Sequence, residues 1–169
     1  MTSAPLTRTL ITGLAATLSA AALLTGCSAI SDLVPQNATR DGETGVVTEA
    51  GDTSVFTLRE GDCINDVAEM VSDVPTVPCD QLHDWEVYRN VTMTDTDFPG
   101  DEAIAAFADE QCNAEFGTFI GVAYESSVYE NNYYVPNADS WEQLGDRIVS
   151  CLVGDPAGQV TGSLRGIGA

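Results

Sequence analysis

Residues 85–93 read Trp-Glu-Val-Tyr-Arg-Asn-Val-Thr-Met, and residues 101–116 read Asp-Glu-Ala-Ile-Ala-Ala-Phe-Ala-Asp-Glu-Gln-Cys-Asn-Ala-Glu-Phe. The first stretch alternates between apolar and polar side chains, which predicts a half-buried strand. Its apolar face consists of Trp85, Val87, Val91 and Met93. Arg89 interrupts that face, so either a bulge turns Arg89 outward or its charge pairs with a buried acid, and the sequence leaves both open.

The second stretch predicts the main helix, over about residues 101–116. Pro99-Gly100 precedes it, and acidic residues occupy its first turn, where they meet the positive end of the helix dipole. Apolar side chains recur at helical spacing and form one buried stripe: Ile104, Phe107, Ala108, Cys112 and Phe116. Gly117 and Gly121 are placed to end the helix.

Short β-prone segments flank this central pair. We expect strands at 55–58, near Cys63, at 147–153 and at 159–164. Residues 74–79 are extended, but two prolines confine them to a sheet edge or bar them from regular pairing. The Tyr- and Asn-rich stretch 124–134 is a loop or a strand, and 139–141 is a turn or a single helical turn. Strands, one helix and strands again predict a small α+β domain of mainly antiparallel strands.

The amino-terminal segment has the pattern of a lipoprotein signal peptide. Arg8 is followed by an apolar stretch of signal-peptide length, which is too short for a spanning helix. It ends in Leu24-Thr25-Gly26-Cys27, which resembles the bacterial lipobox. We therefore expect residues 1–26 to be removed, Cys27 to carry lipid, and the chain to lie on the extracytoplasmic face of the cell membrane. Residues 27–53 are predicted to form a flexible tether, and residues 54–166 the domain.

The mature chain is strongly acidic. After residue 26 it holds five arginines, no lysine and all 26 acidic residues, a net charge of −21. This charge repels phosphate backbones and anionic lipid head groups, so nucleic-acid binding is not expected. It could attract cations or basic patches on other proteins.

Four cysteines remain beside Cys27, and an even number in an exported chain indicates two disulfides. Of the three possible pairings, we favour Cys63–Cys79 and Cys112–Cys151. The first would join neighbouring segments, and the second would link the apolar face of the helix to the core face of the 147–153 strand. Because no pair is spaced C-x-x-C and the chain has a single histidine, we expect no zinc site.

Residues 79–86 are the one candidate chemical cluster. His83 is flanked by Asp80, Asp84 and Glu86, so it could act as a general base or a metal ligand. In a strand, however, His83 and its acidic neighbours point to opposite faces, and no serine lies in a nucleophile-elbow context. The interpretation that we prefer is structural, with the imidazole bonded to backbone or carboxylate. The acidic residues near 95–102 do not complete a calcium loop.

The ordered set of short motifs resembles the actinobacterial septum formation domain family. The motifs are Gly61-Asp62-Cys63, Val77-Pro78-Cys79, His83-Asp84, Glu86-Val87, Cys112, Pro136, Trp141, Gly145-Asp146-Arg147 and Cys151. The resemblance covers roughly residues 58–165. It implies a membrane-attached or lipoprotein-borne domain associated with cell division, and it brings no catalytic residues. His83, Trp141, Asp146 and Arg147 are as well explained by fold maintenance.

These observations give three hypotheses. The first is a non-enzymatic lipoprotein module that binds an envelope or division protein, without a cofactor. The second is an ion- or cell-wall-glycan-binding module that uses the 124–137 segment. The third, ranked last, is a hydrolase centred on His83.

Overall fold

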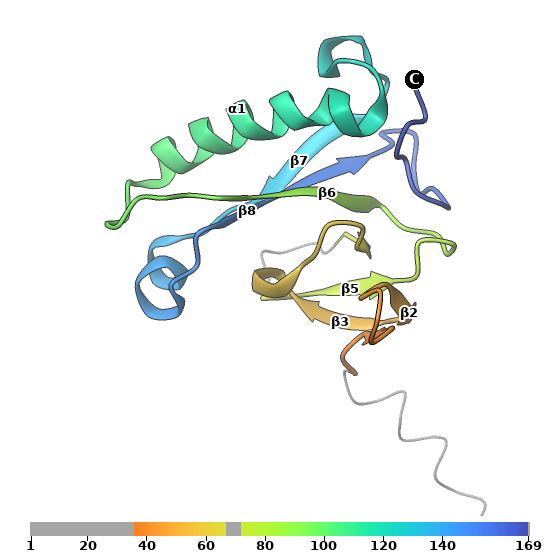
Figure 1. Cartoon of the computed structure of the whole chain (residues 1–169), viewed down its shortest axis with the longest axis horizontal. Helices are drawn as coiled ribbons and strands as arrows, with labels where there is room; N and C mark the ends of the chain where they lie inside the picture. The colour runs from red at the N-terminus through yellow and green to blue at the C-terminus, as the bar shows by residue number, and fades with distance from the viewer. Residues whose placement is uncertain (1–35, 67–71, 169) are drawn as a thin grey trace, which may run out of the picture. The chain divides into compact units, whose positions relative to one another are not determined.

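A computed structural model of the chain describes residues 36–66 and 72–168. Its main feature is a six-stranded antiparallel sheet in the order β3-β5-β4-β6-β8-β7 (Figure 1). The strands are β3 (Gly51–Ser54), β4 (Cys63–Ile64), β5 (Asp73–Val77), β6 (Trp85–Thr92), β7 (Glu130–Tyr134) and β8 (Ile148–Gly154). A two-stranded sheet pairs β1 (Thr39–Arg40) with β2 (Val47–Glu49). This is the predicted α+β class, with one main helix and mainly antiparallel strands.

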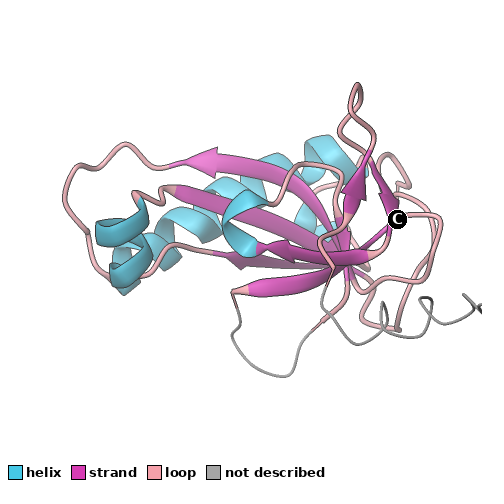
Figure 2. Cartoon of the chain, turned by 90° about the horizontal axis from the view of Figure 1, so that it is seen from below, coloured by secondary structure: helices cyan, strands magenta, loops and turns pink. Residues whose placement is uncertain are grey.

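Helix α1 (Asp101–Ile120) lies along one face of β6, β8 and β7 (Figure 1), and Figure 2 shows the same layering from below. It is one turn longer than the predicted 101–116, because its last turn buries Phe119 and Ile120 in the core. Gly121 ends it in a left-handed conformation, φ 102°, with its N–H bonded to Gly117 O. Glycine adopts this conformation without steric cost, which explains the stop.

A β-bulge in β6 decides which side chains enter the core under α1. The register with β8 shifts between Val87 and Arg89, so Val87 pairs with Leu152 and Arg89 with Cys151. The bulge was one of the two alternatives for Arg89, whose side chain is exposed and lies near Glu60 and Glu115. The predicted alternation is wrong across the bulge, because Tyr88, expected on the polar face, is buried against α1.

A second apolar cluster fills the face of the sheet opposite α1. It contains Leu58, Ile64, Val74, Val87 and Leu152. Residues 55–57, predicted as a strand, form the 3-10 turn η2 (Val55–Thr57) at the border of this cluster. β8 is therefore buried on both faces, with Val149, Cys151 and Val153 toward α1 as predicted.

The prediction of a flexible tether over 27–53 is wrong from residue 36 onward. Residues 39–54 form β1, β2 and β3, and β3 pairs with β5. Arg40 fixes this region, because its Nη2 donates to Oδ2 of the buried Asp62 (2.7 Å). The predicted signal peptide, Cys27 and the first part of the tether lie outside the described residues.

Two further strand predictions are wrong. β5 is an inner strand, paired with β3 on one side and β4 on the other, although it contains Pro75. Residues 159–164 make an isolated bridge between Val160 and His83 instead of a strand. They are held by side chains of β6 and its preceding loop rather than by a ladder.

The two disulfides pair as predicted. Cys63–Cys79 joins β4 to the end of the β5 segment, and Cys112–Cys151 joins α1 to β8. Cys63, Cys112 and Cys151 are completely buried. The second bond crosses the core between the helix and the most buried strand.

Candidate functional site

His83 is fully buried, with an exposed fraction of 0%. Its Nδ1 lies 2.9 Å from Gln81 O, and its backbone N–H and C=O both pair with Val160 (3.0 Å each). Its Nε2 has no hydrogen-bond partner among the described residues. A substrate cannot reach an imidazole that has no exposed surface. The buried position of His83 therefore fits a structural role in the turn after Cys79 and does not fit a general base.

The acidic neighbours of His83 hold the carboxy-terminal segment. Glu86 is 2% exposed and accepts hydrogen bonds from Ser163 Oγ (2.7 Å) and the Leu164 N–H (2.8 Å). Asp84 Oδ2 accepts a hydrogen bond from Gln159 Nε2 (3.3 Å) in this segment and another from the Asp66 N–H (2.8 Å). Of the residues that the sequence grouped as a chemical cluster, His83, Asp84 and Glu86 thus act together as a clamp on residues 159–164. Asp80 is exposed.

Trp141, Asp146 and Arg147 form a compact corner around the π-helical turn η4 (Ser140–Leu144). The Arg147 guanidinium lies 3.7 Å from the centre of the Trp141 ring. Its Nη1 donates to the carbonyls of Trp141 (2.9 Å) and Asp146 (2.8 Å), and its Nη2 reaches Thr96 O (3.2 Å). Arg147 thereby ties the loop after β6 to the start of β8.

This corner and the His83 clamp lie at opposite ends of the β6–β8 pair. Glu86 pairs with Val153 at one end, and Thr92 pairs with Ile148 at the other. The six candidate residues therefore do not converge on one site: His83, Asp84, Glu86, Trp141, Asp146 and Arg147. Two of them line different hollows of the surface, Asp146 at one and Asp84 at another. Asp146 Oδ1 also accepts the Ile148 N–H (3.0 Å).

The Tyr- and Asn-rich stretch splits into three parts. Residues 124–126 form the 3-10 turn η3 (Tyr124–Ser126), residues 130–134 form the edge strand β7, and the segment after β7 returns toward η4. Tyr88 donates its hydroxyl to Cys112 O (2.7 Å) beneath this strand. Burial, reinforced by the charge of Glu115, raises the pKa of Tyr88 well above its usual range.

The two tyrosines at the end of β7 are also harder to ionise than usual. Burial, with Asp109 close by, raises the pKa of Tyr133, and burial with the charge of Asp66 raises the pKa of Tyr134. Tyr133 packs against the core under α1, whereas Tyr134 packs against the second apolar cluster. Both phenols stay neutral at physiological pH.

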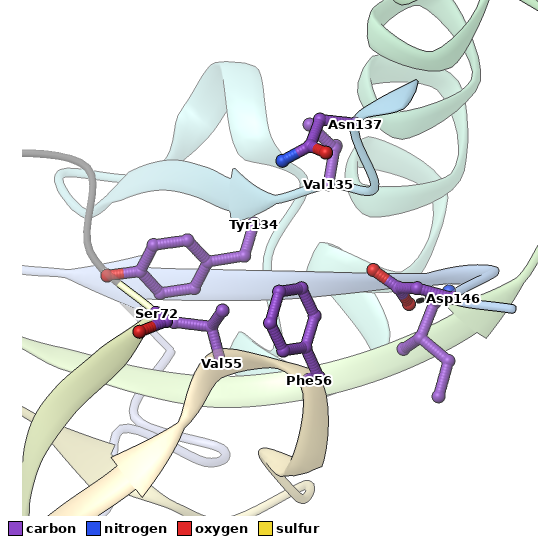
Figure 3. Close-up of a pocket in the computed structure, with 8 residues that line it drawn as sticks. Val55, Phe56, Ser72, Tyr134, Val135, Asn137 and Asp146 are labelled. Atoms are coloured by element: carbon purple, nitrogen blue, oxygen red, sulfur yellow. Dashed lines mark hydrogen bonds between the residues drawn. The ribbon is translucent and has the colours of Figure 1, made fainter. Parts of the chain in front are cut away.

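A pocket of about 320 Å³ opens where β7 ends, and we call it the apolar pocket. Figure 3 shows the Phe56 ring pointing from η2 into the space between Tyr134 and Asp146. The apolar pocket is lined by Val55, Phe56, Ser72, Tyr134, Val135, Asn137, Asp146 and Ile148. The volume lies at the lower end of the range for ligand sites, and a few polar groups among apolar ones is the usual composition of such sites.

Sequence reasoning anticipated part of this pocket. Asn137 and Tyr134 fall in the segment expected to bind a ligand, and Asp146 was a candidate. Phe56 and Ile148 were missed because they come from a predicted strand and from the start of β8. The signal for this pocket is an exposed aliphatic side chain, and that of Ile148 is 38% exposed. Exposure follows from the tertiary structure, so the sequence alone does not reveal it.

Within residues 36–66 and 72–168, no group of three or more His, Cys, Asp or Glu side chains is arranged to hold a metal ion. In the same ranges, no helix has both the length and the apolar character that a membrane span requires. Neither the acidic stretch near 95–102 nor the cluster around His83 forms a metal centre in the described chain.

The model of the family described as septum formation matches residues 43–166, which contain α1, β4 to β8 and both disulfides. The chain belongs to the septum formation family. The match begins eleven residues before the predicted domain start at 54 and includes β2 and β3, in agreement with the corrected boundary.

A curated protein is also similar to this chain along most of the length of both. The protein named "Putative lipoprotein LppN" of Mycobacterium bovis (strain ATCC BAA-935 / AF2122/97) is 27% identical over 168 residues, covering 88% of this chain and 93% of the relative. No solved structure matches.

Proposed function

We propose that the chain is a non-enzymatic lipoprotein whose septum formation domain binds a partner at the extracytoplasmic face of the cell membrane during cell division. The family match supports the link to septum formation. The lipobox ending at Cys27 and the name of the mycobacterial relative support the lipid anchor.

One observation carries the non-enzymatic part of the proposal. His83, the chain's one histidine, has no exposed surface, and Glu86 is bonded to the carboxy-terminal segment. Catalysis by a general base requires that the base reach the proton it removes. Arg147 is likewise engaged with four backbone carbonyls. These side chains hold the domain together and leave its surface for binding.

The anchor is tested by metabolic labelling with an alkyne analogue of palmitate in the producing bacterium. We expect the wild-type chain to take up the label and to remain in the membrane fraction. A Cys27→Ala variant should be unlabelled. Equal labelling of the two forms would remove the anchor from the proposal.

The binding role is tested by crosslinking on intact cells with a water-soluble carbodiimide, which joins carboxylates to lysine amines. Because the chain has 26 acidic residues and no lysine, copies of it cannot crosslink to each other through lysine, and adducts report other proteins. We expect a small set of division proteins in the adducts of the wild-type chain. Adducts unrelated to division would contradict the septal role.

A further inference from the structure

β7 is an edge of the main sheet, and in the described chain no strand pairs with its outer side. The opposite edge is covered, because the Asp52 N–H in β3 donates to Gln36 O (2.7 Å) and the Ala38 N–H donates to Asp52 O (3.0 Å). β7 pairs with β8 over five residues in unbroken register and contains no proline, lysine or arginine. Bulges, prolines and lysines are the features that protect sheet edges, so β7 can accept another strand.

An added strand would replace one local hydrogen bond of β7. The Tyr133 N–H donates to Oδ1 of the preceding Asn132 (2.8 Å). This side chain is exposed and can rotate away, leaving the N–H to a carbonyl of an incoming backbone. The exchange costs little, because one hydrogen bond to an amide oxygen replaces another.

Alternate residues of β7 face opposite sides of the sheet. Asn131 faces α1, where its Nδ2 donates to Asn113 Oδ1 (3.0 Å). Tyr134 packs against the second apolar cluster, so Glu130, four residues earlier, shares its face. An incoming strand would present its own alternate side chains beside these two residues.

A hollow lies at each end of that face of β7. The apolar pocket is at the Tyr134 end, and the exposed aliphatic side chains of Val135 and Ile148 are on its rim. At the Glu130 end lies a smaller hollow of about 150 Å³ beside Trp85, which we call the acidic hollow. Its carboxylates belong to Asp66, Asp84, Glu130 and Asp155. In the described part of the chain, no arginine lines either hollow.

Building on the binding role proposed above, we propose that β7 receives an extended segment of another protein as a further strand of the sheet. The segment carries a basic side chain at the acidic hollow and a bulky apolar side chain at the apolar pocket. Because Glu130 and Tyr134 are four residues apart, so are these two side chains, about 13 Å along the strand. A basic partner complements a chain of net charge −20, whereas a second copy would bring the same charge.

The test is to pan a display library of random nonapeptides against the full chain. Enriched peptides should share an arginine or lysine four positions from a leucine, isoleucine or phenylalanine. A spacing of three would put the two side chains on opposite faces and should not be enriched. No enrichment, or enrichment without this spacing, overturns the proposal.

Matched variants then locate the binding surface. Glu130→Lys and Val135→Asp should each weaken binding of an enriched peptide about tenfold or more, because each replaces a favourable contact by an unfavourable one. Glu125→Lys and Leu144→Asp make the same changes at exposed positions on η3 and η4 and should leave the affinity unchanged. Equal effects of the test and control variants would contradict docking on β7.

Hydrogen exchange separates strand addition from other modes of binding. The Tyr133 amide should exchange more slowly with peptide bound, because it becomes part of a ladder. Binding without slower exchange would overturn strand addition, and binding of soluble peptidoglycan fragments alone would assign the surface to glycan. Because these measurements use the purified chain, they can fail while Cys27 labelling succeeds, and the reverse also holds.

Discussion

Arg147 makes more contacts with other segments than any other arginine described above, and its contacts depend on a planar guanidinium. The group stacks on Trp141 and donates to carbonyls of both the loop after β6 and the turn before β8. Lysine keeps the charge but cannot make this fork of bonds. We expect Arg147→Lys to lower the free energy of unfolding by about 1–2 kcal/mol in urea titration.

Arg165→Lys is the control for this change. Arg165 also lies over an aromatic ring, that of Phe119, at 4.4 Å, but it is exposed. Its replacement should change stability by less than about 0.5 kcal/mol. Equal effects of the two substitutions would show that the bonds of Arg147 to the carbonyls add nothing.

Glu86 is a second case in which one residue matters, because its buried carboxylate holds the carboxy-terminal segment. Glu86→Gln replaces one carboxylate oxygen, which accepts hydrogen bonds, by an amide NH2 group, which donates them. This group would face either Ser163 Oγ or the Leu164 N–H. We expect a loss of about 1–3 kcal/mol, measured by urea unfolding, and earlier proteolysis of residues after 158. The same substitution at exposed Glu125 should have little effect, and a stable Glu86→Gln chain with an intact tail would contradict the clamp.

At the scale of elements, a glycine inside α1 and the glycine that ends it give opposite predictions. Gly121 has φ 102°, so Gly121→Ala forces a side chain into a left-handed conformation and should cost about 1 kcal/mol. Gly117 lies inside the helix, and a Cβ there meets its nearest atom, Val122 O, at an ordinary 3.5 Å. Gly117→Ala should therefore be neutral or stabilise by up to about 1 kcal/mol. Thermal unfolding of both variants decides this, and equal signs would contradict it.

The elements also show how far a single sequence can determine structure. The existence of α1 and β8 was predictable because their apolar periodicity is long. The prolines of 74–79 suggested an edge, but β4 pairs only with Thr76 and Val77 of β5, so Pro75 lies beyond that ladder and does not interrupt it. Residues 55–58 look β-prone, but tertiary packing closes them into η2 against the second cluster. Propensity decides little in segments of three or four residues.

For the whole molecule, the two disulfides set the stability of the fold. In the chain-entropy model, loops of 16 and 39 residues give about 3 and about 4 kcal/mol. We therefore expect the double variant Cys112→Ala with Cys151→Ala to lose more stability than Cys63→Ala with Cys79→Ala. Calorimetric melting of both double variants tests the order, and the reverse order would mean that strain or residual structure outweighs loop length.

The stability of the whole domain should also depend on alkaline pH. The pKa values of Tyr88, Tyr133 and Tyr134 are raised in the folded state, whereas an unfolded tyrosine titrates near about pH 10. This contribution to stability is present below about pH 10 and is lost as the pH rises above it, because the unfolded chain releases these protons first. Urea unfolding at rising pH measures the decline.

Tyr88→Phe gives the control for the pH effect. Phenylalanine cannot ionise, so the variant should lose stability less steeply above about pH 10, although it starts lower because the hydrogen bond to Cys112 O is gone. An unchanged slope would mean that Tyr88 does not titrate differently in the two states.

The candidate site could be predicted less well than the fold. The sequence places His83 among acids, but burial decides whether that group is chemical or structural, and burial depends on contacts with Val160 and Leu164, which lie far along the chain. The apolar pocket combines η2, the end of β7 and the start of β8, so no local pattern could reveal it. Asp146 was singled out for its motif, and the structure places it at the pocket.

Both disulfides join cysteines that follow one another along the chain. On the export proposed above, the chain leaves its translocation channel amino end first. Cys79 therefore appears while Cys63 is the partner nearest to it, and Cys112 and Cys151 follow after that pair has closed. An oxidase that acts on thiols in their order of emergence would make both native bonds directly. Maturation of this protein would then need no isomerase to reshuffle wrong pairs.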